Sequence, residues 1–445
     1  MNNKKTNNKK TNNKKTISKQ QSNKKASSSA IIVVLITLMI AIASGNSEAA
    51  IAGAELENVI SENLLPPMAA EEEVNLRHWN IPETKQEFWD LAKLKNAYVN
   101  TAPAFLDDGI SVGKLDDEGR NKTVILELAR QIANKEHAEV DSLLIAHNGK
   151  MVFESYYARG RINLSHPQSS ATKAYTALLV GRAIKLGYLS LEDLDKPVVT
   201  LLKGLDHSKF ARGVETITLH DALTMSSGLE ISKEKVDDYR GNPQKYYGIA
   251  QVQAYFEDTA PIVKSAKTFS YQSFNPIIIM NVLSTAVPGS VEDFAKNELF
   301  HKMNIANYDW RTREVGILTP ESGSSVTSRN MLKIGTLIIN NGKWGNEHLI
   351  PKAYIEKMTE KHTPTLTEEQ VFSSGDKVLT TAYGYFWWQT DVKVGEKVYS
   401  SHSAQGAGGV TILVIDELDV VVVVTGHAMQ SYIQLITEKV LPTFI

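Results

Sequence analysis

Strand-like segments at both ends of the main body, separated by a helical stretch of about 200 residues, limit this chain to few architectures. Residues 142–157 read as two strands joined at Asn148-Gly149, a dipeptide that favours a tight hairpin turn. Near the other end, residues 409–416 and 420–425 form a second strand–turn–strand pattern. We therefore predict an α+β fold whose antiparallel sheet is built from both ends of the chain and flanked by helices, beside a mostly helical region.

Apolar periodicity between and after these strands predicts the helices. Gly187 is expected to end the helix that begins near residue 170, because glycine adopts the left-handed conformation that terminates helices. The polar stretch 230–250 is interpreted as a surface loop or lid, and Tyr383–Trp388 favours a strand. The other predicted helices cover residues 121–136, 216–228, 274–287, 326–340 and 429–441.

The first 50 residues have the parts of a secretory signal. Residues 1–29 contain nine lysines and no acidic residue, and residues 30–43 are an uninterrupted apolar run. Because a membrane span usually needs about 20 apolar residues, this run is short, and an uncleaved anchor is the alternative. We expect a periplasmic or secreted protein, or one anchored in the inner membrane and facing the periplasm, with membrane contact only through residues 30–43.

The chain contains no cysteine, which excludes disulfides, thiolate chemistry and cysteine-ligated metals. Without residues 1–50, acidic side chains outnumber basic ones by ten, so a nucleic-acid partner is not expected. No cofactor and no metal site are predicted, since the spacing of the histidines does not match a metal-binding motif; the histidines considered are His166, His220, His402 and His427.

Ser170 and Lys173 are the strongest candidates for chemistry. They stand at spacing i, i+3 at the start of an apolar helical segment, so their side chains share one face of the helix. The free N–H groups of a helix start favour a developing oxyanion. The apolar residues that follow desolvate the lysine, which lowers its pKa and allows it to activate a neighbouring hydroxyl.

Two further stretches could complete such a site. Tyr271 begins another apolar helical run, and it could act as a base if a cation such as Lys173 lowered its pKa. Otherwise it would be an interfacial tyrosine of the core. The small residues 406–409 precede a long strand, where their backbone could approach a ligand and donate to an oxyanion, or could form a plain turn.

Together these segments resemble the serine β-lactamase and penicillin-binding-protein-like hydrolases, in particular the class C β-lactamase-related branch with its esterases and 6-aminohexanoate-dimer hydrolases. Six blocks in the family's order carry the resemblance, over about residues 140–430. They are His166–Lys173, Ile217–Leu229, Tyr271–Ser273, Asn341–Trp344, Tyr383–Trp388 and Gly406–Asp416. The resemblance implies a β-lactamase/transpeptidase-like fold for residues 121–445, with residues 51–120 as a lead-in and N-terminal extension.

The resemblance also implies roles for single residues. Ser170 would be the acylated nucleophile and Lys173 its partner, while Tyr271 would be a shared general acid and base that activates the deacylating water. The family's third motif falls on Ala404-Gln405-Gly406 or in a frame starting at Ser401-His402-Ser403. In the first frame the N–H of Ala407 joins that of Ser170 in the oxyanion hole. Candidates for substrate binding are Ser273, Gln405, Gly406 and Trp387.

Two departures from the family pattern indicate which class of substrate is favoured. The third motif lacks its lysine, which in β-lactamases and D,D-peptidases holds the substrate carboxylate, and Ser273 stands where the family often has asparagine. The sequence therefore favours an exported serine hydrolase that cleaves small-molecule esters, amides or peptide-like substrates without a cofactor. The alternatives are a true β-lactamase or D,D-peptidase, and a membrane-tethered sensor that is acylated but hardly turns over. The sequence does not indicate an oligomeric state.

Overall fold

The computed structural model describes residues 60–61, 65–71, 73, 88–117, 120–137, 139–314, 316–372, 375–428 and 431–445. The chain divides into two units, and the fold described here is that of the second, Ser61–Ile445. The predicted signal or anchor lies outside the described residues.

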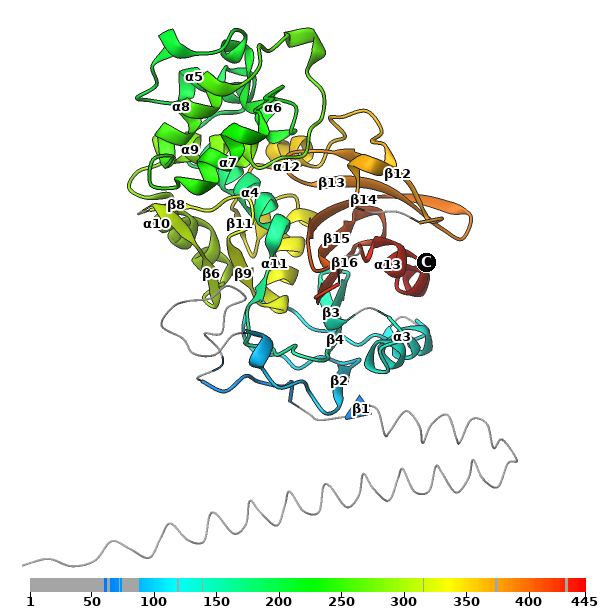
Figure 1. Cartoon of the computed structure of the whole chain (residues 1–445). Helices are drawn as coiled ribbons and strands as arrows, with labels where there is room; N and C mark the ends of the chain where they lie inside the picture. Colours follow the sequence, from blue (N-terminus) through cyan, green and yellow to red (C-terminus); the bar gives the residue numbers. More distant parts are fainter. Residues whose placement is uncertain are drawn as a thin grey trace, which may run out of the picture. The chain divides into compact units, whose positions relative to one another are not determined.

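A large antiparallel sheet is the centre of this unit, and both ends of the chain contribute strands to it (Figure 1). From β2 onward its strand order is β2-β4-β3-β16-β15-β14-β13-β12. The middle strands β15 and β16 are almost entirely apolar and buried along their whole length, as expected for strands covered on both faces. The strands are β2 (Ala97–Asn100), β3 (Val140–His147), β4 (Lys150–Tyr156), β12 (Val378–Tyr383), β13 (Trp388–Val394), β14 (Lys397–Gly406), β15 (Val410–Ile415) and β16 (Val420–Gly426).

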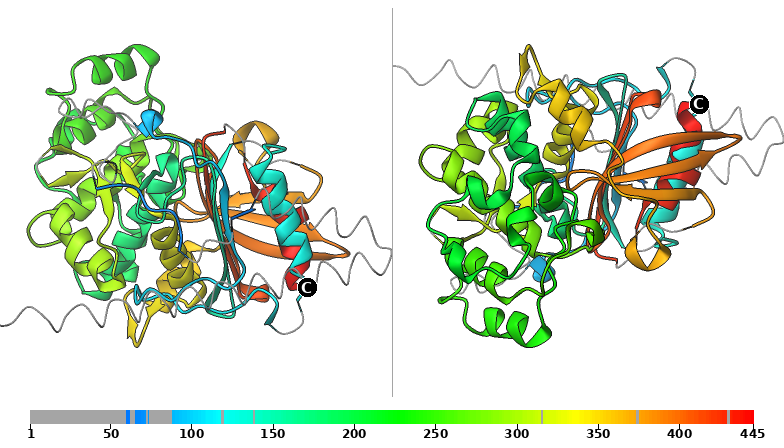
Figure 2. Two further views of the ribbon diagram at one scale, coloured as in Figure 1. Left: turned by 90° about the horizontal axis from the view of Figure 1, so that it is seen from below. Right: turned by 90° about the horizontal axis from the view of Figure 1, so that it is seen from above.

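Helices cover both faces of the sheet, as the two views of Figure 2 show. One face carries α3 (Thr123–Ala133) and α13 (Ile433–Lys439). The other face is covered by α11 (Ser328–Ile339), which packs on β3, β15 and β16, and by the helical region beyond it. The remaining α-helices, all inserted between β4 and β12, are α4 (Thr172–Lys185), α5 (Val198–Leu201), α6 (Leu219–Leu223), α7 (Lys233–Gly241), α8 (Gly248–Asp258), α9 (Phe274–Ala286), α10 (Val291–Phe294) and α12 (Lys352–Met358).

The predicted layout is confirmed, and three local predictions need correction. The strand predicted at Tyr383–Trp388 is instead the connection between β12, which ends at Tyr383, and β13, which begins at Trp388. The segment predicted as a helix over residues 216–228 contains only the short helix α6. Its start is fixed by a capping box at Thr218, and Met225 adopts a left-handed conformation with φ of 58° soon after its end. The stretch 230–250 contains α7 and the start of α8 rather than a loop. Because α7 lies on the surface and is mostly polar, it lacks the apolar periodicity that reveals a helix.

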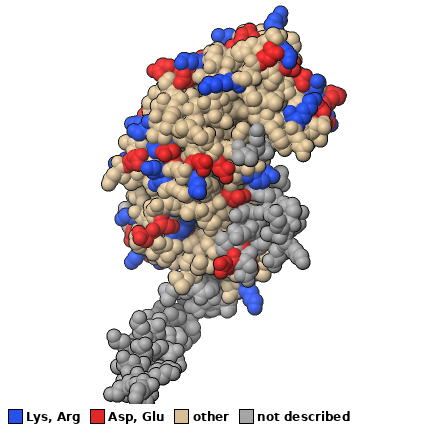
Figure 3. Space-filling model, turned by 90° about the vertical axis from the view of Figure 1, so that its left-hand side faces the viewer, with Lys and Arg blue, Asp and Glu red and all other residues tan. Residues whose placement is uncertain are grey.

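The surface drawn in Figure 3 mixes acidic and basic side chains without a broad area of one sign. Among the described residues no single helix is long and apolar enough to cross a membrane. Only α9 taken together with the following stretch Val291–Met303 passes that test, as a pair bent by 87°. Both parts of this pair are rich in buried side chains of the core.

Candidate active site

Ser170 lies in a single turn of 3₁₀ helix, Ser169–Ala171, that leads directly into α4. The turn is held from below by Gln168, which is fully buried. The Gln168 side chain donates to the carbonyl of His166 and accepts from the hydroxyl of Tyr175, at 2.8 and 2.5 Å. The Ser170 side chain is half-buried, so its hydroxyl is fixed in place and still reachable from outside.

Lys173 follows in the first turn of α4 and meets Ser170 as the spacing predicted. Its Nζ lies 3.0 Å from Ser170 Oγ and donates to the backbone carbonyl of Glu321 at 3.0 Å. The side chain is buried, and desolvation lowers its pKa to about 7. Near pH 7 about half of the protein therefore carries this amine in its uncharged form. It can keep its bond to Glu321 while its lone pair accepts the proton of Ser170.

Tyr271 completes a group of three around the serine hydroxyl. Its ring stacks on Trp388, with ring centroids 5.4 Å apart, and Lys173 Nζ lies 4.8 Å from the centroid of the Tyr271 ring. Burial raises the pKa of Tyr271 to about 12, and a hydrogen bond with Ser170 only partly opposes this. The expected lowering of this pKa by Lys173 is thus not found. Tyr271 stays protonated near neutral pH, where it can donate or relay a proton but is a poor resting base.

Replacing Tyr271 by phenylalanine is expected to reduce kcat/KM by about 10²–10³-fold, the usual contribution of a positioned acid or base. The ring, its stacking on Trp388 and its contact with Lys173 are all retained, so the fold should not change. The acid limb of the pH–rate profile should remain near pH 7, because it reports Lys173. A shift of that limb in the variant would instead assign it to the tyrosine.

The end of β14 lies against the serine turn, in the position expected for the third motif. Contact between the two is very close, because a side chain on Gly406 would meet the Gln168 carbonyl at 2.1 Å. Ser170, Gln405, Gly406 and Ala407 line one cavity of about 100 Å³. In the alternative frame His402 points elsewhere, bonding to Gln389 and Asp416. The frame ending at Gly406 therefore fits the structure, with Ala407 beside the nucleophile.

Gly406→Ala tests this close approach. The added methyl group must push the end of β14 away from the serine turn, so the oxyanion donors separate and kcat should fall by about 10²–10³-fold. Gly395→Ala is the control for strain elsewhere in the sheet. Gly395 lies in the β13–β14 hairpin with nothing within 4 Å of an added carbon, and its φ of 59° alone makes alanine strained there. Equal losses in the two variants, measured by steady-state kinetics, would show a general effect on the sheet rather than on the site.

Of the other residues predicted to bind substrate, the structure places two beside the site and one in the core. Ser273 precedes α9 and lines a cleft next to the site, as proposed for a substrate contact. Gln405 lines the cavity at Ser170 and bonds to Ser403 and Ser431. Trp387, however, is fully buried in the core and is not available to a substrate. Its neighbour Trp388 is the tryptophan that contacts Tyr271, a difference of one residue that sequence reasoning missed.

The adjoining cleft, of about 530 Å³, is the larger of the two spaces near the catalytic group. Its inner wall includes Glu321, whose carbonyl holds Lys173, so the cleft reaches the catalytic lysine. Its outer wall comes from α7, α8 and the segment between them, and it combines tyrosine rings with polar side chains. The tyrosines of this wall are Tyr239, Tyr246, Tyr247 and Tyr255, and Phe274 at the start of α9 lines the same cleft.

The four histidines do not behave alike. His220 pairs with Tyr385, and His402 pairs with Gln389 and Asp416, as ordinary structural residues do. His166 and His427 do not have the spacing of a metal-binding motif either, but the structure brings both to Asp141. No sequence spacing could have revealed this group, because 286 residues separate the aspartate from the second histidine.

Several solved structures share this fold at low sequence identity. A Bacillus anthracis protein described as a 6-aminohexanoate-dimer hydrolase matches with a TM-score of 0.55 and 16% identity over 83% of this chain and 95% of that one. A Bacteroides dorei DSM 17855 protein described as a beta-lactamase gives 0.55 and 15% over 73% and 95%. A class C beta-lactamase gives 0.53 and 15% over 74% and 98%. At this identity the likeness shows the fold alone.

No curated protein sequence matches the chain. The sequence profile of the family described as Beta-lactamase, however, matches residues 126–433, which is more than two thirds of the chain. The matched span begins in α3 and ends at the start of α13, so it includes the serine turn, Tyr271 and the whole of β14. With the fold, the Ser170–Lys173–Tyr271 group and this match in agreement, the chain belongs to the beta-lactamase family.

Proposed function

We propose that this chain is a serine hydrolase that cleaves ester or linear amide bonds through an acyl-enzyme on Ser170. The observation that carries the proposal is the pair of Ser170 Oγ and Lys173 Nζ, 3.0 Å apart, with the lysine pKa lowered to about 7. A buried neutral amine beside a hydroxyl makes an activated nucleophile without a metal or cofactor.

The reaction follows from these positions. Ser170 Oγ forms a bond to the substrate carbonyl carbon while its proton passes to Lys173. The carbonyl oxygen becomes an oxyanion, which the backbone N–H groups of Ser170 and Ala407 receive at the cavity they line. The leaving group departs with a proton relayed by Tyr271 from Lys173. Water then attacks the acyl carbon and gives a proton to the same amine. The bond between Ser170 Oγ and the acyl carbon breaks, the amine returns the proton to Oγ, and the acid product leaves.

The choice of substrate rests on two features. Ala404 takes the place of the lysine that would hold the carboxylate of a penicillin, and it is itself buried. The small cavity at Ser170 opens beside a cleft about five times larger, whose wall is rich in tyrosine. Aromatic surfaces bind flat or apolar groups. We therefore expect esters or amides with a bulky apolar group to be better substrates than β-lactams.

A substrate panel tests the proposal. Turnover of p-nitrophenyl acetate, p-nitrophenyl phenylacetate, a linear anilide and nitrocefin is compared at equal enzyme concentration. The expected order places the phenylacetyl ester first and nitrocefin last. Fastest turnover of nitrocefin would support the β-lactamase alternative. Covalent labelling of Ser170 by a fluorophosphonate without release or turnover of any substrate would support the acylated sensor.

Export is a separate part of the proposal, and it rests on residues 1–50 alone. Expression of the full chain in a bacterial host, followed by fractionation and N-terminal sequencing, tests it. A mature N-terminus near residue 51 in the periplasm or medium is the expected result. An intact chain in the membrane fraction would indicate the anchor, and an intact chain in the cytoplasm would contradict export.

A further inference from the structure

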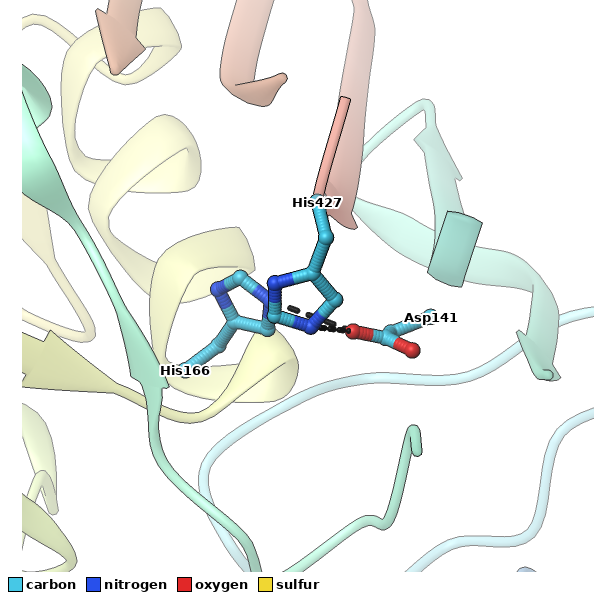
Figure 4. A group of neighbouring side chains, drawn as sticks. All are labelled: Asp141, His166 and His427. Atoms are coloured by element: carbon cyan, nitrogen blue, oxygen red, sulfur yellow. Dashed lines mark hydrogen bonds and ion pairs between the residues drawn. The ribbon is translucent and has the colours of Figure 1, made fainter. Parts of the chain in front are cut away.

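Asp141, His166 and His427 form a buried group that the hydrolytic reaction does not use (Figure 4). Asp141 stands at the start of β3, His166 in the two-residue strand β5 (His166–Pro167), and His427 directly after β16. Their side chains are 1%, 8% and 7% exposed. Three segments that are distant in sequence thus bring one carboxylate and two imidazoles together inside the protein.

The donor atoms of the three side chains converge on one point. His427 Nε2 and His166 Nε2 lie 2.5 and 3.2 Å from the same oxygen, Asp141 Oδ2. All three donor atoms lie within 4.8 Å of one another. The other carboxylate oxygen, Oδ1, accepts the backbone N–H of Arg159 at 2.9 Å, which fixes the orientation of the group and leaves Oδ2 for the two rings.

The hydrogen bond of the other ring nitrogen of His166 determines which of its nitrogens carries the hydrogen. Its Nδ1 lies 3.1 Å from the carbonyl oxygen of Pro167, and a carbonyl can only accept, so Nδ1 carries the hydrogen. In a neutral ring Nε2 then presents a lone pair to the carboxylate oxygen 3.2 Å away. Two lone pairs at that distance repel each other. The contact is favourable only if the ring is charged or if a cation lies between the two atoms.

We propose that Asp141, His166 and His427 bind one divalent ion of the zinc type. Two imidazoles and one carboxylate are three of the four ligands that zinc takes, and a water molecule would supply the fourth. A ligating histidine commonly donates its other N–H to a backbone carbonyl, as His166 does. Zinc–ligand bonds of about 2.0–2.1 Å separate tetrahedral ligand atoms by about 3.3 Å. Two imidazoles already aimed at one oxygen need only small movements to reach that geometry.

The surroundings favour a tightly held ion. Phe88 and Trp89 from the N-terminal segment lie against His427, with ring centroids 5.0 and 4.5 Å away, so they shield the group from water. The ion would join β3, β16 and β5, and His166 is only four residues before Ser170. It would therefore be a structural ion that steadies the segment leading to the nucleophile, and Asp141, His166 and His427 would be positioning residues rather than catalytic ones.

Metal binding by the full-length chain tests the proposal directly. Purified protein is stripped with a chelator and titrated with Co²⁺, whose visible absorption reports coordination by nitrogen and oxygen, and with Zn²⁺ in competition. One ion per chain is expected. His427→Gln and Asp141→Asn should weaken binding by at least about 100-fold, since loss of even a second-layer partner costs 10–100-fold. His402→Gln, which breaks another histidine–aspartate pair, should bind like the wild type.

Two other results would contradict the proposed metal site. Wild-type protein that takes up no stoichiometric Co²⁺ or Zn²⁺ would show that a proton, not a metal, is shared by the group. Binding that is unchanged in folded His427→Gln protein would place the ion elsewhere. Circular dichroism identifies variants that fail to fold. If a variant fails to fold, the titration of the wild-type protein alone tests whether the chain binds the ion. Because the readout is absorption, hydrolytic failure of the enzyme would not affect the result.

Discussion

Replacing Ser170 by alanine is expected to lower kcat/KM for an activated ester by about 10⁵-fold, equivalent to about 7 kcal/mol of transition-state stabilisation. The reason is that no other group can form the acyl bond from this position. Lys173 Nζ lies 3.0 Å from the serine oxygen, and Tyr271 is hydrogen-bonded to it. The cavity and its backbone donors remain in the variant, so a small residual rate above that in water should persist.

Ser169→Ala is the matched control. Ser169 shares the same 3₁₀ turn and has a left-handed φ of 45°, so its replacement disturbs the same backbone without removing the nucleophile. It should retain most of the activity and should still be labelled by a fluorophosphonate, whereas Ser170→Ala should not be labelled. Ester turnover by Ser170→Ala at the wild-type rate would refute the assignment.

The sequence predicted the parts of the site that depend on local geometry. Ser170 and Lys173 are one helical turn apart, so their meeting follows from the helix alone. The resemblance to known hydrolases placed Tyr271 and the end of β14, and the structure brings both to the serine. The sheet built from both chain ends was visible for the same reason, since Asn148-Gly149 and the apolar strands near the C-terminus are local signals.

Properties that depend on burial could not be read from the sequence. The pKa of Tyr271 rises because packed aromatic rings desolvate its hydroxyl, and a one-dimensional pattern does not contain that packing. Trp387 and Trp388 are adjacent and chemically identical, and the sequence does not show that β13 begins at Trp388, the one that contacts Tyr271. The group at Asp141 needs three segments to converge, so it emerges only from the tertiary fold.

Lys173→Met is expected to reduce kcat/KM by about 10⁴-fold and at the same time to stabilise the protein. Methionine has a similar length and no charge, so it fills the buried site but cannot accept the proton of Ser170. In the wild type, kcat/KM should rise with pH to a plateau, with a midpoint near 7 where the amine loses its proton. The variant should have a low rate without this limb.

The stability gain follows from the same lowered pKa. In the folded protein the pKa of Lys173 is about 7, and in the unfolded chain it is near the ordinary lysine value of 10.5. Below pH 7 the lysine is charged in both states, and burying that charge costs about 5 kcal/mol. Between pH 7 and 10.5 the unfolded chain binds more protons, so wild-type stability rises with pH, by about 1.4 kcal/mol per unit at most. Above 10.5 the cost is absent.

Lys173→Met should therefore exceed the wild type in free energy of unfolding by about 2–4 kcal/mol at pH 6, after about 1–3 kcal/mol is lost at the unpaired Glu321 carbonyl. The difference should shrink as the pH rises towards 10. Lys333→Met is the control, because Lys333 is also buried and also donates to a backbone carbonyl, at Asn304, outside the catalytic group. That variant should keep the wild-type rate and its acid limb. Urea unfolding at pH 6 and pH 9 measures the free energy of unfolding of each variant and of the wild type. A gain for Lys173→Met over the wild type that is smaller at pH 6 than at pH 9 would show that burial does not hold the lysine neutral.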